Sequence, residues 1–267
     1  FVKGLVAGRE YGDGAAKFEC PPPAFGYSYN RHECVTTLVA EAFPVTLSLA
    51  VGAFVLWLSV GVSLGILAAR KRNEWQDRGA TAFVLIGTSL PTFISGILIL
   101  LFVALKFNLI NPLEMGRWVS PLEDPVAWFR SFIFPWITLA LLYAAGYTRF
   151  TRSSVIEISS EDYIRTARAK GLNERDILRK HTLRAALAPI VTLAGLDFAG
   201  LLGGAIITEG IFNLPGLGRL SIRAVLNDYD LPTILATTIL AASFVVIANL
   251  LVDILYAYID PRVRVAS

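Results

Sequence analysis

Stretches of apolar residues with at most one charge recur along the chain, and most are long enough to cross a membrane. A helix needs about 20 apolar residues to span the hydrocarbon core of a bilayer. Because backbone polar groups in lipid must be paired within the chain, we expect these stretches to form helices rather than open strands. The pattern predicts five spanning helices, at 43–69, 80–105, 132–148, 185–208 and 233–259.

Composition agrees with a membrane protein, since 55% of the 267 residues are hydrophobic and 17% are charged. Soluble domains usually carry about 25% charged residues. The alternative is a soluble protein with five buried apolar helices, which would be unusual for so short a chain. We therefore expect the all-α fold of a polytopic membrane protein.

Lysine and arginine are unevenly distributed between the loops, which indicates how the helices are oriented. Three alternate segments, at 70–79, 149–184 and 260–267, carry 15 of the 24 basic residues. We expect these segments, and with them the C-terminus, on the cytoplasmic side. This bias explains the net charge of +3, which does not argue for nucleic acid as a partner.

The same orientation divides the chain into regions. Residues 1–42 are predicted to form an extracytoplasmic segment, and 43–267 a transmembrane domain with a long inner loop at 149–184 and an outer loop at 209–232. The first segment has no apolar stretch that would export it. We therefore expect an anchoring helix upstream, which would make six helices in the complete protein.

The outer loop 209–232 combines a turn-rich stretch at 212–216 with an amphipathic stretch at 217–226. The second stretch is expected to be a short helix at the outer membrane surface. Ile222, Val225 and Leu226 share one face of this helix, and Arg219 and Arg223 lie elsewhere on it.

The chain contains two cysteines, Cys20 and Cys34, and both fall in the segment expected outside the cytoplasm. An even pair in an oxidising compartment is typical of a disulfide. The alternatives are two free thiols or a metal-binding pair completed by His32.

The inner loop 149–184 carries signals for two helices joined by a glycine. Ser159 and Ser160 are candidate N-caps for a helix that runs to Lys170, and Gly171 is expected to end it in a left-handed conformation. Asn173 would cap a second helix leading into the next span. A simple positively charged connector is the alternative, but the ordered caps favour a docking element for a cytoplasmic partner.

Small residues would leave the backbone of this first helix close to its surface. They are Ala167, Ala169 and Gly171, and they would let another protein approach closely.

The stretch 162–172 closely resembles the cytoplasmic coupling loop of the permeases of ATP-binding-cassette (ABC) importers, above all in the dipeptide, oligopeptide and nickel branch. The loop signature of that family is Glu-Ala-Ala, three residues, Gly, nine residues, then Ile-x-Leu-Pro. Arg165-Thr166-Ala167 and Gly171 occupy its first half, and of the second half only Leu183 is kept. The resemblance continues at 203–205, 209–212, 214–219, 253–256 and 260–262.

This resemblance implies the transmembrane domain of a type I ABC importer and the first, B-type, permease subunit of a di- or oligopeptide importer. Nickel or another solute of the same branch is an alternative cargo, and a secondary peptide transporter is an alternative class. The residues implied in ATPase coupling are Glu161, Asp162, Tyr163, Arg165, Thr166, Ala167, Arg168, Ala169, Lys170 and Gly171.

The implied partners are a homologous second permease, two ATPase subunits, an extracytoplasmic substrate-binding (lipo)protein, the peptide and membrane lipid. ATP hydrolysis needs a glycine-rich loop ending in Gly-Lys-Ser/Thr, and the sequence has none. ATP and magnesium are therefore expected on the partner ATPases. We identify no catalytic or metal-binding residue and no cofactor in this chain, and we expect it in the inner (plasma) membrane.

Polar groups inside the expected spans are candidates for the translocation pathway, because ionisable groups in a membrane are costly. Asp197 lies near the middle of its span, where it would either face the pathway or bond to a neighbouring helix. Asn249 and Asp253 share a helix face, and Asp253 is expected to pair with a loop arginine. An intramembrane protease using Asp197 and Asp253 is disfavoured because the two carboxylates differ in depth.

Glycines in the fourth span suggest a close helix contact. Gly200 and Gly204 form one small-xxx-small pair, and Ala199 and Gly203 form another. We expect Gly200, Gly203 and Gly204 either at the interface with the second permease or in packing within this subunit.

Overall fold

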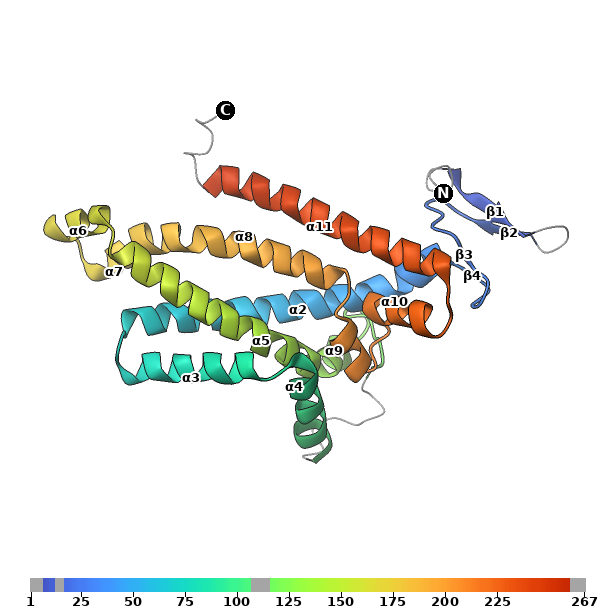
Figure 1. Ribbon diagram of the computed structural model, residues 1–267, viewed down its shortest axis with the longest axis horizontal. Coiled ribbons are helices and arrows are strands. Elements are labelled where there is room, and N and C mark those ends of the chain that lie inside the picture. Colours follow the sequence, from blue (N-terminus) through green and yellow to red (C-terminus); the bar gives the residue numbers. More distant parts are fainter. Residues whose placement is uncertain (1–6, 13–16, 107–115, 260–267) are drawn as a thin grey trace. The chain divides into compact units, whose positions relative to one another are not determined.

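The computed structural model describes residues 7–12, 17–106 and 116–259, which are mainly helical with two short hairpins (Figure 1). The strands are β1 (Arg9–Tyr11), β2 (Phe18–Cys20), β3 (Tyr27–Ser28) and β4 (Glu33–Cys34), paired antiparallel as β1–β2 and β3–β4. The helices are α2 (Val35–Arg70), α3 (Trp75–Ser89), α4 (Thr92–Leu98), the π-helix η1 (Ile99–Lys106), α5 (Pro125–Ser159), α6 (Asp162–Ala169), α7 (Glu174–Asp176), the π-helix η2 (Ile177–Thr182), α8 (Leu183–Leu202), α9 (Ile206–Ile211), α10 (Leu217–Leu226) and α11 (Leu231–Ile259).

The expected number of spans is confirmed for the described residues. Four helices are long and apolar enough to cross a membrane, and a fifth span is obtained when the bent pair Trp75–Ser89 and Thr92–Phe102 is counted as one. The span predicted at 80–105 is present as this bent pair, whose two helices meet at 100°. The residue before a proline is driven out of the helical region, and Leu90, before Pro91, is extended.

Two spanning helices are longer than the sequence predicted. Helix α2 has 36 residues and α5 has 35, so each exceeds what a bilayer core requires. Because α5 continues to Ser159, the prediction that Ser159 and Ser160 cap the next helix is wrong. Glu161 holds the N-cap position of α6, and its side chain makes no capping hydrogen bond.

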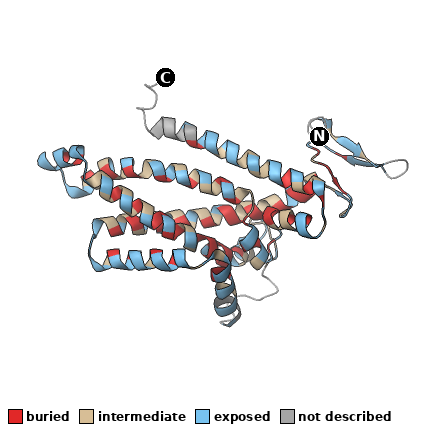
Figure 2. Cartoon of the chain, in the orientation of Figure 1, coloured by how far each residue is buried: buried red, intermediate tan, exposed pale blue. Residues whose placement is uncertain are grey.

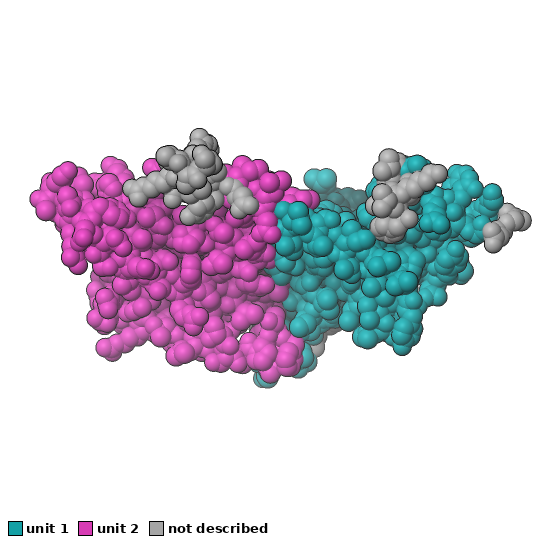
Figure 3. Space-filling model, turned by 45° about the horizontal axis from the view of Figure 1, so that its top comes forward, with its two compact units in different colours: residues 1–51, 96–135, 199–246 teal, residues 52–95, 136–198, 247–267 magenta. Residues whose placement is uncertain are grey.

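The chain divides into two compact units, coloured teal and magenta in Figure 3. Unit 1 comprises residues 1–51, 96–135 and 199–246, and unit 2 comprises residues 52–95, 136–198 and 247–267. The long helices α2, α5 and α11 each contribute residues to both units.

Unit 1 has its core where the start of α2 meets α10 and α11. The buried cluster consists of Val35, Leu38, Val39, Ala42, Leu217, Leu220 and Ala236. The bounds of α10 match the predicted 217–226. Val225 and Leu226, on the apolar face identified in the sequence, do not pack within the chain but are exposed. The face of Leu217 and Leu220 packs instead, because these residues meet the apolar start of α2.

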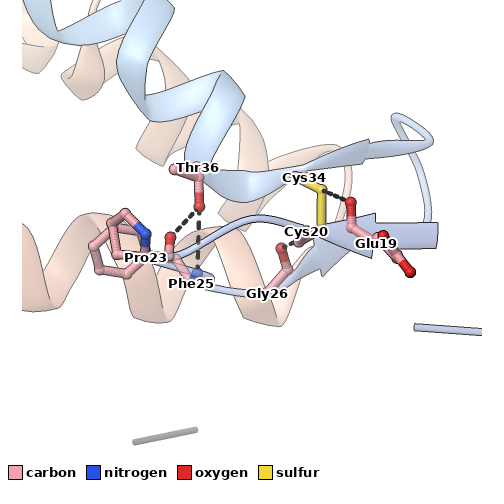
Figure 4. The surroundings of a disulfide bond; sticks show 7 residues. All are labelled: Glu19, Cys20, Pro23, Phe25, Gly26, Cys34 and Thr36. Atoms are coloured by element: carbon pink, nitrogen blue, oxygen red, sulfur yellow. Dashed lines mark hydrogen bonds between the residues drawn. A yellow bond between two sulfur atoms is a disulfide. The ribbon is translucent and has the colours of Figure 1, made fainter. Parts of the chain in front are cut away.

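A disulfide between Cys20 of β2 and Cys34 of β4 joins the two hairpins of unit 1 (Figure 4). Cys34 ends β4 and immediately precedes α2. At the second residue of α2, the Thr36 hydroxyl donates to the Pro23 carbonyl oxygen and accepts from the Phe25 amide. Covalent and polar links thus fix the chain where it enters the first long helix.

Unit 2 is organised by the close approach of α2 to α5. Gly65 lies directly against α5, since a Cβ there would come within 2.8 Å of the Thr148 carbonyl oxygen. Asp77 of α3 is buried and forms a two-point ion pair with Arg152 of α5, with Nε–Oδ1 2.6 Å and Nη2–Oδ2 2.9 Å. Two neighbouring helices are therefore fixed to α5, one by backbone contact and one by charge.

Helix α11 is apolar yet little buried. It carries a stretch of high mean hydropathy, of which 11% is buried, and Figure 2 shows exposed residues along the part of the helix that is coloured by burial. Such a surface is suited to lipid or to another membrane-spanning chain.

Candidate functional site

The loop between α5 and α8 forms a helix, a glycine break and a second short helix. Gly171 ends the first with φ +78°, as expected for a left-handed C-terminal glycine. The Asn173 side chain caps α7 by accepting from the Arg175 amide at 3.1 Å. Both local predictions from the sequence are confirmed.

A small core and one ion pair hold this loop together. Ile164 and Ala167 of α6 pack on Ile177 of η2 as a buried cluster. Arg168 Nε donates to Glu174 Oε1 at 2.7 Å, which ties α6 to α7 across the glycine. Contacts within the loop therefore fix α6 against the helices that follow it.

Burial divides the ten coupling residues into two groups. Ala167 is buried within the chain, so the expectation that it forms part of an open, low surface is wrong; it packs against Ile164 and Ile177. Tyr163, 47% exposed, is the largest apolar group on the outer face. The remaining residues are exposed, namely Glu161, Asp162, Arg165, Thr166, Arg168, Ala169, Lys170 and Gly171.

Asp197 lines an open cavity of about 520 Å³ in unit 2. The Tyr147 hydroxyl donates to Asp197 Oδ2 at 2.6 Å, so the carboxylate is hydrogen-bonded as well as facing the cavity. Arg149 and Tyr143 line the same space. The arrangement offers one acidic and one basic group on an aromatic wall, which suits a ligand that carries both charges.

An aromatic cluster supports that wall. Trp57 of α2 is fully buried and stacks on Tyr143 at 4.6 Å between ring centroids. Phe54, one turn earlier, makes an edge contact with Phe198, the neighbour of Asp197. These ring contacts therefore hold Tyr143 and Phe198, the residues near the Asp197 carboxylate.

The other pathway candidates are not brought to this cavity. Asn249 is exposed and does not line it. The side chain of Asp253 lies outside the described residues, as do residues 260–262. Of the proposed polar residues whose side chains the structure describes, Asp197 and Asn249, Asp197 alone lines the cavity.

The glycine pairs predicted on the fourth span do not form a helix face, because α8 ends at Leu202 rather than 208. Gly204 has φ +118° and would meet Gly218 if it carried a Cβ. Gly203 lies against Ala241 of α11. Gly200 is exposed, with open space around its missing side chain, so it alone of the three remains available to another protein.

Sequence reasoning missed the role of Glu209, a fully buried acid in α9. Its Oε1 accepts from Thr46 Oγ1 at 2.8 Å and its Oε2 from the Arg219 amide at 2.9 Å. The Thr46 hydroxyl also accepts from the Leu217 amide at 2.8 Å. An acid placed shortly before a glycine-rich turn that starts a helix was the available signal, since such turns present free amides.

Burial raises the pKa of Glu209 above its ordinary value, and the hydrogen bonds from Arg219, Thr46 and Gly218 oppose that rise. The group joins α2, α9 and the start of α10. It is a structural centre beneath the outer surface of unit 1 rather than a group open to ligands.

Comparison with known proteins places these features in a family. Residues 61–265 match the family described as binding-protein-dependent transport system inner membrane component, and residues 1–50 match the family of the N-terminal part of the membrane component of such systems. A putative peptide transport system permease protein of Brucella abortus (strain 2308) is 40% identical over 239 residues, which cover 90% of this chain and 75% of that protein.

The glutathione transport system permease protein GsiC of Escherichia coli (strain K12) is 38% identical over 241 residues, covering 90% of this chain and 74% of its own. Among solved structures, the inward-facing MetNI methionine ABC transporter matches with a TM-score of 0.66 at 18% identity, covering 84% of this chain and 97% of that one. An amino acid ABC transporter solved with histidines matches with a TM-score of 0.58 at 17% identity, covering 85% and 94%. These two likenesses concern the fold.

Proposed function

The chain belongs to the family of binding-protein-dependent transport system inner membrane components, and on that premise we propose that it is the permease through which an ABC importer admits short peptides. Relatives at 38–40% identity over nine-tenths of the chain are named peptide and glutathione permeases, and this observation carries the choice of cargo. The cavity at Asp197 supports it, because its acidic, basic and aromatic groups match the chemistry of a peptide.

The exposed face of α6, with Tyr163, Arg165, Ala169 and Lys170, is the surface we assign to a cytoplasmic ATPase. It is prefolded and basic, and it lies in the loop with the greatest excess of lysine and arginine. ATP and magnesium would be held by two such ATPase subunits, a homologous permease would complete the pathway, and an extracytoplasmic binding protein would deliver the peptide. Gly200 and the exposed surface of α11 are available for the second permease.

Uptake by the complete transporter tests this function. Proteoliposomes holding both permeases, both ATPases and the binding protein should accumulate a labelled tripeptide when ATP is present and not without it. Nickel uptake in place of peptide uptake would support the alternative cargo. Peptide uptake that follows a proton gradient and ignores ATP would indicate a secondary transporter.

We further propose that Asp197 selects among peptides on the pathway. A carboxylate facing a cavity favours a passing cation, so basic peptides should be taken up better than acidic ones. Asp197→Asn preserves shape and removes the charge, and it should lower the ratio of basic to acidic peptide uptake by severalfold. Tyr147→Phe is the matched control, since it removes the hydrogen-bond donor and leaves the charge. An unchanged ratio in Asp197→Asn, with normal assembly, would reduce Asp197 to a structural role.

A further inference from the structure

A second cavity, of about 460 Å³, lies in unit 1 beside the start of α2 and along α10. Its volume falls in the range of small-molecule sites, about 300–1,000 Å³. Its wall combines two kinds of surface. Apolar groups come from Leu38, Pro44, Trp118 and Leu220, and charged groups come from Glu41 and three arginines.

The arginines differ in how far they are already paired. Arg31 forms an ion pair with Asp228 at 3.2 Å. Arg219 uses Nη1 to donate to the Asn213 carbonyl oxygen at 2.7 Å, which leaves its charge unpaired by any acid side chain in the described part of the chain. Arg223, one turn further along α10, is exposed and has no ion pair within the described residues.

The two guanidinium groups on α10 act on each other. The pKa of Arg219 is lowered, first by desolvation and then by the positive charge of Arg223, while the buried Glu209 opposes the shift. Two like charges on one cavity wall repel, and an anion bound between them would relieve the repulsion. Guanidinium groups are well suited to bind carboxylate oxygens because their N–H donors form a planar fork.

Glu41 supplies the opposite charge on the same wall, at the start of α2. The cavity therefore offers a cationic pair for an anion, a carboxylate for a cation and apolar surface with them. A short peptide with free ends carries the complementary groups, which are a terminal carboxylate, a terminal ammonium and side chains.

We propose that this cavity is a binding site for short peptides, in which Arg219 and Arg223 receive the terminal carboxylate and Glu41 faces the ammonium group. The inference rests on the proposed peptide import and adds a site to it that is distinct from the cavity at Asp197. A zwitterionic phospholipid headgroup presents similar charges through its phosphate, so the test separates the two sources.

The test measures binding to the complete transporter in nanodiscs, without binding protein or ATP. The probes are a fluorescent tripeptide with a free carboxylate and the same tripeptide as its C-terminal amide. Wild type should bind the acid about tenfold more tightly than the amide, as expected for one charge-assisted contact. Arg223→Gln should abolish this preference, and Arg223→Lys should retain part of it.

Arg117→Gln is the matched control, because Arg117 is an exposed arginine beside Trp118 that does not line the cavity. It should leave the preference intact. Equal binding of acid and amide by the wild type, or a preference that survives Arg223→Gln, would overturn the inference. A phospholipid site would also overturn it. In that case native mass spectrometry would find a phospholipid bound to the wild type but not to Arg223→Gln, and both proteins would bind the peptide equally.

Failure of this site is distinguishable from failure of peptide import. If wild-type proteoliposomes take up the tripeptide and the acid preference is absent, the cavity is not a peptide site but the transporter is still a peptide importer. If no peptide is taken up under any condition, the proposed function itself is wrong.

Discussion

At the residue scale, the loop before α10 is held by polar groups that have no access to water. Thr46 and Glu209 are both fully buried, and between them they satisfy the amides of Leu217 and Arg219. Amides at the start of a helix have no partner within the helix. The first turn of α10 is therefore completed by side chains from α2 and α9.

Removal of the Thr46 hydroxyl should consequently destabilise the fold. In Thr46→Val the Leu217 amide loses its acceptor and Glu209 loses a donor, which should lower the free energy of unfolding by about 1–3 kcal/mol. Thr46→Ser keeps the hydroxyl and should lose much less. Thermal unfolding in detergent measures both, with Thr238→Val as control, since that exposed hydroxyl bonds only to a carbonyl of its own helix. Equal losses in the Val and Ser variants would show that packing dominates over hydrogen bonding.

The buried Glu209 should also make stability depend on pH. Its folded-state pKa is raised from the ordinary value of 4.5, chiefly by burial. A carboxyl with a raised pKa stabilises the fold below its ordinary pKa, and that contribution is lost as pH rises through the folded-state value. The melting temperature of wild type relative to Glu209→Gln should therefore fall as pH increases from 4.5 upward. A difference that stays constant across this range would contradict the assigned shift.

At the element scale, α6 owes its position to contacts on one face only. Ile164 and Ala167 face inward onto Ile177, whereas Ala169 faces outward. The low outer surface that a partner would need is thus provided by Ala169 and Gly171, not by Ala167.

Ala169→Trp should therefore block the proposed ATPase contact while the loop still folds. We expect ATPase subunits to co-purify with this variant at a tenth of the wild-type level or less, because a bulky side chain prevents close approach. Ala185→Trp, at an equally exposed alanine in α8, is the control and should assemble normally. Ala167→Trp is expected to disrupt the loop itself, which trypsin cleavage after Lys170 would reveal. Normal co-purification with Ala169→Trp would mean that this face does not meet the ATPase.

The sequence predicted the presence of these elements better than the residues at which they begin and end. Gly171 and Asn173 were identifiable because the left-handed glycine and the side-chain cap depend on neighbouring residues alone. The end of α8 at Leu202 was not, because Gly203 and Gly204 leave the helix in order to pack against Ala241 and Gly218. Those contacts join distant parts of the chain, and hydrophobic pattern does not encode them.

The same distinction applies to the candidate sites. Asp197 was found from its charge within an apolar span, which is a local signal. Glu209 was missed because its partners Thr46 and Arg219 lie 163 and 10 residues away along the chain. The face of α10 that packs within the chain was likewise not identified from the sequence, since both of its faces carry apolar residues and the contact with α2 decides between them.

At the scale of the whole molecule, the orientation inferred from basic residues can be tested with thiol chemistry. Tyr229→Cys and Leu172→Cys place single thiols at exposed positions on loops expected on opposite sides of the membrane. A membrane-impermeant maleimide should label Tyr229→Cys in intact cells and label Leu172→Cys only after lysis. The unsubstituted chain is the control, because Cys20 and Cys34 are joined and leave no thiol. The reverse pattern would invert the topology, and labelling of the unsubstituted chain would argue against the disulfide.

The bond between Thr46 and Glu209 also has a consequence for biosynthesis. The two residues are separated by 163 positions, and a ribosome adds about 5–20 residues per second. Thr46, in the first long helix, is therefore synthesised on the order of 10–30 seconds before its acceptor Glu209. During that interval the Thr46 hydroxyl needs another partner, such as its own helix, water or the insertion machinery. The contacts that complete the start of α10 thus form only once α9 and α10 have themselves been translated.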